Sequence, residues 1–214
     1  MSMHSVKMFN RFERFWHWTQ VLLIFTLIFT GFAIHGTHSL IDFGPAVMLH
    51  SWAAIGLVLL WVFAIFWHLT TGAWRHYVPT SNGLFKVARF YAYGVFRGEH
   101  HPYKKTFRRK HNPLQALAYL GLKLVLFPAI WISGGIYLLS GFFASDGNLQ
   151  IVAIIHTAAA YLIVVFVIAH VYLLTTGHSF IAHVKPMVTG YDDVELTEAE
   201  LAYLKQDDPG SIRS

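Results

Sequence analysis

The sequence predicts an all-α membrane protein: a four-transmembrane-helix bundle with an interfacial helix in a long cytoplasmic loop and a short C-terminal helix. Three observations predict this fold. The 214 residues are 55% hydrophobic and only 13% charged, whereas soluble domains carry about 25% charged residues. Four apolar stretches reach the length of about 20 residues that a helix needs to cross a bilayer. Lysine and arginine gather in the segments on one side of these stretches.

The four apolar stretches cover about residues 16–34, 47–71, 114–143 and 151–176. They must be helices, because a lone strand in lipid cannot satisfy its own backbone hydrogen bonds. We expect residues 1–185 to form one four-helix domain and residues 186–214 to form a cytoplasmic tail.

The distribution of positive charge predicts the orientation of these helices. The connections at residues 36–46 and 144–150 contain no lysine or arginine. Positive residues stay on the cytoplasmic side, so we expect both termini and the long connection to be cytoplasmic in a multi-pass protein of the bacterial inner membrane. The net charge of +5 is then a signal of topology and points to membrane lipid, not to nucleic acid. The long connection carries nine basic residues: Arg75, Lys86, Arg89, Arg97, Lys104, Lys105, Arg108, Arg109 and Lys110.

Two short helices are predicted outside the spans. Residues 82–97 place Phe85, Ala88, Tyr91 and Val95 on one helical stripe, which suits a helix lying in the membrane interface. Near the C-terminus, Thr197 is followed three residues later by a glutamate. This capping box predicts a short exposed helix that ends at about residue 205.

Histidine is the residue type that points to chemistry. The chain has 14 histidines and no cysteine, which excludes disulfides, thiolate zinc sites, cysteine-ligated iron–sulfur clusters and covalently attached haem c. Ionisable side chains at membrane depth are costly and indicate function. Five histidines lie inside the predicted spans: His17, His50, His68, His156 and His170.

The predicted topology sorts four of these histidines into two pairs. His156 and His170 share one face of the fourth span and are separated by about 21 Å along it. The first span enters from the cytoplasm, so His17 lies at the depth of His170. The second span enters from the periplasm, so His50 lies at the depth of His156.

Two imidazoles that face each other at one depth can hold a haem iron from both sides. A di-iron or zinc hydrolase site would need carboxylates, and the predicted spans contain no aspartate or glutamate. His68 shares the face of His50, 18 residues away, at cytoplasmic depth. It could replace an axial ligand, contact a haem propionate or line a substrate pocket, and we favour the last two roles. Four glycines could give a macrocycle room to approach the backbone: Gly31, Gly56, Gly134 and Gly135.

Four motifs carry a resemblance to a known family: RFERFWHW, LHSWAAIG, KHNPLQALAYL and IIHTAAAYLIVVFVIAHVY. Over about residues 9–185 the sequence resembles the gamma (cytochrome b) subunits of respiratory formate dehydrogenases. More widely, it is similar to the diheme cytochromes b of thiosulfate reductases and nickel–iron hydrogenases.

The resemblance implies two haem b groups. One would be held by His17 and His170 on the cytoplasmic side, and the other by His50 and His156 on the periplasmic side. It also implies a quinone, menaquinone or ubiquinone, bound near Asn112. His111, Gln115 and His68 are further candidates for contacts with this quinone. An alternative for Asn112 is that it caps the third span, with a proline in the first turn. The sequence departs from many relatives at His68, where an arginine is expected.

The resemblance further implies transmembrane electron transfer between a periplasmic redox subunit, carrying iron–sulfur clusters or several haems, and the quinone pool. The chain would be the quinone-reactive subunit of an oxidoreductase complex. One alternative is a stand-alone diheme quinone oxidoreductase that reacts with superoxide or another small oxidant, but such proteins generally lack a long cytoplasmic loop. An alternative of a different class is a histidine-relay proton channel or transporter, which would predict more polar spans.

Overall fold

The computed structural model describes residues 2–100, 102, 112–140, 146–175 and 179–213. The chain divides into two compact units. The first unit combines residues 1–15, 73–120 and 172–214, and the second combines residues 16–72 and 121–171. The five histidines of the predicted spans all lie in the second unit.

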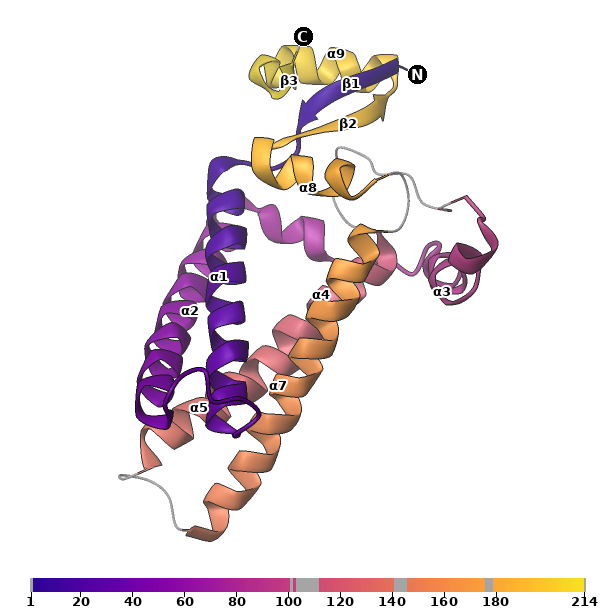
Figure 1. Ribbon diagram of the computed structural model, residues 1–214. Coiled ribbons are helices and arrows are strands. Elements are labelled where there is room, and N and C mark those ends of the chain that lie inside the picture. The colour runs from indigo at the N-terminus through magenta and orange to yellow at the C-terminus, as the bar shows by residue number, and fades with distance from the viewer. Residues whose placement is uncertain (1, 101, 103–111, 141–145, 176–178, 214) are drawn as a thin grey trace. The chain divides into compact units, whose positions relative to one another are not determined.

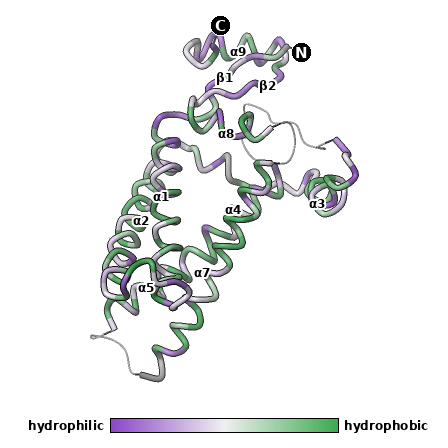
Figure 2. The backbone as a smooth tube through the Cα atoms, viewed as in Figure 1, coloured by the Kyte–Doolittle hydropathy of each residue, from purple (hydrophilic) through white to green (hydrophobic). Residues whose placement is uncertain are grey.

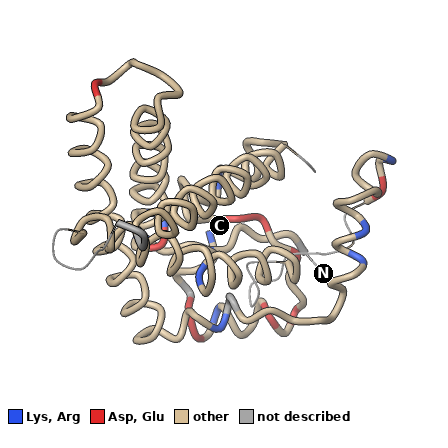
Figure 3. The backbone as a smooth tube through the Cα atoms, turned by 90° about the horizontal axis from the view of Figure 1, so that it is seen from below, with Lys and Arg blue, Asp and Glu red and all other residues tan. Residues whose placement is uncertain are grey.

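Long helices dominate the structure (Figure 1). The long helices are α1 (Arg11–Ile34), α2 (Phe43–Thr71) and α7 (Asp146–Leu174), and two shorter helices, α4 (Pro113–Gly121) and α5 (Phe127–Leu138), belong to the third span. Four helical stretches are long and apolar enough to cross a membrane, as predicted: Arg11–Ile34, Phe43–Thr71, Pro113–Leu138 and Leu149–Leu174. The hydropathy colouring of Figure 2 shows the same helices as predominantly hydrophobic, and Figure 3 shows few charged residues along them.

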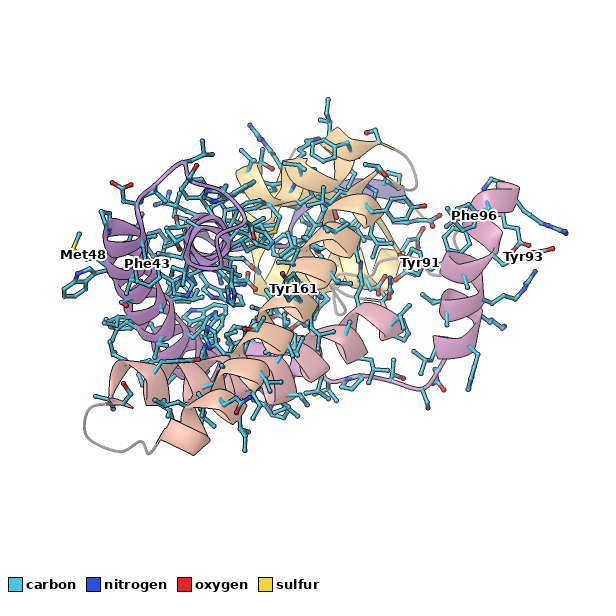
Figure 4. All side chains as sticks on the ribbon, turned by 60° about the horizontal axis from the view of Figure 1, so that its bottom comes forward. Phe43, Met48, Tyr91, Tyr93, Phe96 and Tyr161 are labelled. Atoms are coloured by element: carbon cyan, nitrogen blue, oxygen red, sulfur yellow. The ribbon has the colours of Figure 1, made fainter. Side chains whose placement is uncertain are left out.

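Many large apolar side chains on these helices are exposed, as lipid-facing side chains would be. On α2, Phe63 and Phe66 are each 66% exposed. Phe43 and Met48, on the same helix, also lie on its outer side, as Figure 4 shows. The buried side of the second unit is an aromatic cluster in which Trp61 stacks on Phe127 with 3.8 Å between ring centroids.

The third span is interrupted by one π-helical turn, η3 (Leu122–Leu126), between α4 and α5. In this turn the N–H of Phe127 bonds to the carbonyl oxygen of Leu122. The next residue is Pro128, which has no N–H with which to continue the α-helical ladder. The proline therefore explains why the helix widens here, a feature that the sequence analysis did not predict. The extra residue leaves both Leu122 and Phe127 buried in the aromatic cluster.

The helix predicted over residues 82–97 is present as α3 (Leu84–Ala92) and a short 3-10 turn, η2 (Gly94–Arg97). The side of this helix that is buried in the protein is not the stripe predicted to face the membrane interface. Val87 and Phe90 are buried, whereas Phe85 is 87% exposed. Another 3-10 turn, η1 (Ala73–Tyr77), follows α2.

The chain ends form a small sheet that the sequence analysis did not predict. Strand β1 (Ser2–Lys7) lies between β2 (Tyr191–Leu196) and β3 (Ile212–Arg213), and both pairings are antiparallel. Helix α8 (Phe180–Thr189) precedes β2, while α9 (Glu198–Asp207) and η4 (Pro209–Ser211) separate it from β3. The predicted capping box at the start of α9 is confirmed, because the Thr197 hydroxyl accepts from the N–H of Glu200.

Candidate functional site

The structure brings His50 of α2 and His156 of α7 together. Their ring centroids are 6.3 Å apart. A ligating imidazole nitrogen lies about 2 Å from its metal ion, and the ring centroid lies roughly 1 Å further. Two imidazoles that share one metal ion from opposite sides therefore have centroids about 6 Å apart. The observed separation has this value.

A buried hydroxyl fixes the orientation of each of these two rings. His50 Nδ1 lies 2.9 Å from Thr30 Oγ1, and His156 Nδ1 lies 2.9 Å from Ser133 Oγ. Each hydroxyl also lies within hydrogen-bond distance of a carbonyl of its own helix, Thr26 O at 2.7 Å and Ala129 O at 2.6 Å. Because a carbonyl oxygen can only accept, this arrangement favours a hydroxyl that donates to the carbonyl and accepts from the imidazole N–H.

This arrangement favours the tautomer of both histidines in which Nδ1 carries the proton. With the proton on Nδ1, the lone pair of Nε2 is free to bind a metal ion. Metal-ligating histidines almost always donate their other ring N–H in this way. The sequence analysis missed both hydroxyl residues.

Each hydroxyl residue is followed by a glycine that lies against the same imidazole. A Cβ on Gly31 would lie 3.5 Å from His50 Cε1, and one on Gly134 would lie 3.2 Å from His156 Cε1. Each of the dipeptides Thr30-Gly31 and Ser133-Gly134 thus provides one histidine with a hydroxyl partner and with a glycine whose backbone lies close to the imidazole ring. Of the other glycines predicted to give clearance, a Cβ on Gly56 would meet Leu23, and one on Gly135 would meet no described side chain within 4 Å.

The second predicted pair is also in the second unit, and its surroundings differ. His17 of α1 lies within electrostatic range of His170 of α7. Phe166 stacks on the His170 ring, with centroids 6.1 Å apart and an angle of 11°. His17 Nδ1 is buried and has no hydrogen-bond partner among the described residues.

His68 is buried beside the start of α1. It is 7% exposed, and its Nδ1 lies within hydrogen-bond distance of Ala64 O on the preceding turn. Its ring meets the edges of two indoles, Trp16 at 5.3 Å and Trp67 at 5.1 Å between centroids.

Of the predicted quinone contacts, Asn112 and Gln115 lie in the first unit, whereas His68 lies in the second. Asn112 caps α4, because its Oδ1 accepts from the N–H of Gln115 at 2.8 Å. Gln115 returns the bond, as its Oε1 accepts from the N–H of Asn112 at 3.1 Å. The predicted capping role of Asn112 is therefore confirmed. His111 lies outside the described residues.

A tyrosine that the sequence analysis did not assign to this site contacts the same asparagine. Asn112 Nδ2 donates to the hydroxyl of Tyr91 on α3 at 3.2 Å, and Figure 4 shows Tyr91 on that helix. Burial raises the pKa of Tyr91, and the bond from Asn112 acts in the opposite direction. The carboxamide NH₂ has a second hydrogen, which this bond does not use.

The chain can be compared with known protein families and proteins. The family model described as prokaryotic cytochrome b561 matches residues 8–190. The chain belongs to this family. It is also similar to the protein named "Putative cytochrome YdhU" of Escherichia coli (strain K12), at 29% identity over 197 residues that cover 87% of this chain and 74% of the relative. No solved structure matches the chain.

Members of the prokaryotic cytochrome b561 family are membrane cytochromes that bind haem b, and this chain, with four apolar helices, is a multi-pass membrane protein. The residues present fit such a group. The grouped donors are imidazole nitrogens, and within the described residues there is no cluster of three or more metal-ligating side chains that would suit a bare metal ion. Small residues also leave backbone close to two of the rings.

Proposed function

We propose that this chain is the diheme cytochrome b subunit of a respiratory oxidoreductase complex. It carries electrons across the inner membrane between a periplasmic redox partner and the quinone pool. One observation carries most of the proposal: the His50–His156 separation of 6.3 Å, with both Nδ1 atoms held by hydroxyls.

In this proposal His50 and His156 hold the periplasmic-side haem, and His17 and His170 hold the cytoplasmic-side haem. Haem iron, when bound, supplies reversible one-electron redox chemistry. The protein supplies the ligands, the hydroxyls that orient two of them, and the surrounding low dielectric of the aromatic cluster. It needs a partner for any substrate chemistry, because no cysteine is available to bind an iron–sulfur cluster.

The proposed partner is a periplasmic subunit with iron–sulfur clusters or several haems. It would dock on the outer connections next to the His50 and His156 ends of their helices. These connections lack lysine and arginine. Leu40, in the first of these connections, is 80% exposed.

The haem assignment is tested by reduced-minus-oxidised spectra and haem quantitation on the purified chain. Two haems per polypeptide are expected. His50→Ala and His170→Ala should each remove one of them, and the double variant should remove both. A wild-type chain that binds no haem, or single variants that retain both haems, would refute the assignment.

For the quinone, we propose that the remaining N–H of the Asn112 carboxamide donates to a quinone carbonyl. The test is Asn112→Asp, because aspartate keeps the acceptor that caps α4 but loses the NH₂ donor. The measurement is the rate at which a quinol analogue reduces the haems in membranes. We expect roughly a tenfold loss, which corresponds to one hydrogen bond.

A matched control for this substitution is Asn10→Asp. Asn10, directly before α1, makes the same reciprocal bonds with Glu13, both at 2.9 Å. The Asn10→Asp substitution should leave the rate of haem reduction unchanged. An unchanged rate in Asn112→Asp, with both haems bound, would reject the quinone role and leave Asn112 as a helix cap alone.

A further inference from the structure

The connection between the second and third spans carries most of the positive charge of the chain. Residues 72–112 contain nine lysines and arginines and one acidic residue, Glu99. Three of the basic residues, Lys86, Arg89 and Arg97, belong to α3 and η2. Figure 3 shows lysine and arginine along this part of the backbone. The folded part of the connection therefore has an excess of positive charge.

A hydrogen bond ties α3 to the start of the third span. Asn112 Nδ2 donates to the Tyr91 hydroxyl at 3.2 Å, and Asn112 directly precedes α4, the first helix of that span. Both helices belong to the first unit. A helix held where a span begins lies close to the surface of the bilayer. Tyr91 contacts the protein here, although it was predicted to face the membrane interface.

The two sides of α3 have different surroundings. Val87 and Phe90, three residues apart, are buried in the protein. Phe85 lies on the other side and is 87% exposed. Lys86, the next residue, and Arg89, one turn further on, are exposed as well. A large apolar side chain beside basic residues is typical of helices that lie in the headgroup region of a membrane.

The charge of this segment is complementary to anionic lipid. Arg89 pairs with Glu99 at 2.9 Å, and the two side chains are 66% and 36% exposed. Three basic residues against this one acidic residue leave residues 84–99 with a net charge of +2. Anionic phospholipid attracts basic segments that adjoin a membrane span.

Two arginine–aromatic pairs lie on the same side of the membrane as α3. In η1, which begins two residues after α2 ends, Arg75 Cζ lies 5.7 Å from the centroid of the Trp74 ring. In η2, Arg97 Cζ lies 4.4 Å from the centroid of Tyr93, which Figure 4 labels on this segment. Tryptophan and tyrosine are enriched at membrane–water interfaces, whereas lysine is depleted at protein–protein interfaces. The composition therefore favours lipid over a protein partner.

We propose that the exposed side of α3 binds anionic phospholipid. Phe85 enters the headgroup region, and Lys86 and Arg89 contact lipid phosphates. The same helix then has lipid on one side and Asn112 on the other. This inference does not depend on haem or quinone binding, because it uses only the spans and the connection between them.

The test places a nitroxide label in the full chain, which has no cysteine of its own. Phe85→Cys is labelled and measured by electron paramagnetic resonance in nanodiscs of phosphatidylcholine and phosphatidylglycerol. The label should be more accessible to oxygen, which concentrates in lipid, than to a water-soluble nickel chelate. Leu59→Cys, at a 56% exposed site near the middle of α2, is the lipid reference, and Lys205→Cys on α9 is the water reference. Ala92→Cys, two turns after Phe85 on the same side, should repeat the result if the first variant does not fold.

Charge variants of the labelled chain test the contact with headgroups, at a low share of phosphatidylglycerol. Each basic residue near an anionic membrane surface strengthens binding by about fivefold. Lys86→Gln should therefore lower the ratio of inserted to water-exposed label by about fivefold. Glu99→Gln, which removes the acid paired with Arg89, should raise this ratio. A matched control is Lys185→Gln on α8, which should leave the ratio unchanged.

Three results would overturn the inference. The first is a label at residue 85 that the nickel chelate reaches as readily as it reaches the label of Lys205→Cys. The second is a label shielded from both oxygen and the chelate, which would show that a protein surface covers α3. The third is an inserted label that responds neither to omission of phosphatidylglycerol nor to Lys86→Gln. A chain without haem would refute the proposed function and leave this inference standing.

Discussion

Removal of the hydroxyls beside His50 and His156 tests whether these hydroxyls orient the two imidazole rings for binding to a metal ion. The substitutions are Ser133→Ala and Thr30→Val, and the second keeps the shape of the side chain. Ser133 is 3% exposed and Thr30 is fully buried. Water therefore has little access to replace the lost oxygen, and the imidazole Nδ1–H is left without its acceptor.

The size of the effect follows from that lost acceptor. A buried donor without a partner costs about 1–3 kcal/mol, and substitution of such ligand-orienting groups typically lowers metal affinity by about 10- to 100-fold. Each variant should therefore release the His50–His156 haem about 10- to 100-fold more readily than the wild-type chain.

The assay is transfer of haem from the purified chain to an excess of apomyoglobin, followed by visible absorption. The haem that we propose for His17 and His170 is an internal reference, because His17 Nδ1 has no hydroxyl partner among the described residues. A matched control is Thr26→Val on the same helix, whose hydroxyl donates to Leu22 O at 2.9 Å. If Ser133→Ala and Thr30→Val release haem at the rate of Thr26→Val, the hydroxyls do not orient the ligands.

Three further substitutions test the backbone and the caps. Gly134→Ala should lower haem occupancy, because the new Cβ would lie 3.2 Å from the His156 ring. Gly135→Ala should not, because a Cβ there would meet none of the described side chains within 4 Å. Equal occupancies would contradict this reasoning. Gly190→Ala should lower the melting temperature of the purified chain. Gly190 has φ of +91°, and a Cβ there would lie 2.6 Å from a backbone oxygen. An unchanged melting temperature would refute this prediction. Thr197→Ala should destabilise α9 by about 1 kcal/mol, measured by hydrogen exchange, and unchanged protection of α9 would show that the cap contributes little.

The spans could be predicted because length and hydropathy alone determine whether a helix can cross a membrane. The interruption at Leu122–Leu126 could not be predicted in the same way, because hydropathy does not register a change of helix type. Pro128 was the available signal, since a proline removes one N–H from the helical ladder.

The small sheet escaped prediction because its pairing is long-range. Ser2 pairs with Leu196 and Val6 with Ile212. Short polar strands of this kind carry no strong pattern of their own, and their stability comes from tertiary packing. Here Val6, Val194 and Leu196 form a buried core with α9.

At the candidate site, the sequence predicted that His50 and His156 would come together, because their relative position follows from topology and helical rise. It did not predict the hydroxyls of Thr30 and Ser133, since a serine or threonine in a helix commonly bonds to its own backbone. The sequence did contain a signal, because a hydroxyl residue directly precedes a glycine in both Thr30-Gly31 and Ser133-Gly134. Only the glycines of these pairs were predicted to matter. Tyr91 was missed because it was assigned to the membrane-facing stripe.

The central claim is that four histidines hold two haems, and low-temperature electron paramagnetic resonance of the oxidised chain with parallel haem quantitation tests it most directly. We predict two low-spin ferric signals with bis-histidine character and two haems per polypeptide, with a different signal lost in His50→Ala and in His170→Ala. A single signal, a high-spin spectrum in the wild-type chain, or loss of the same signal in both variants would contradict it.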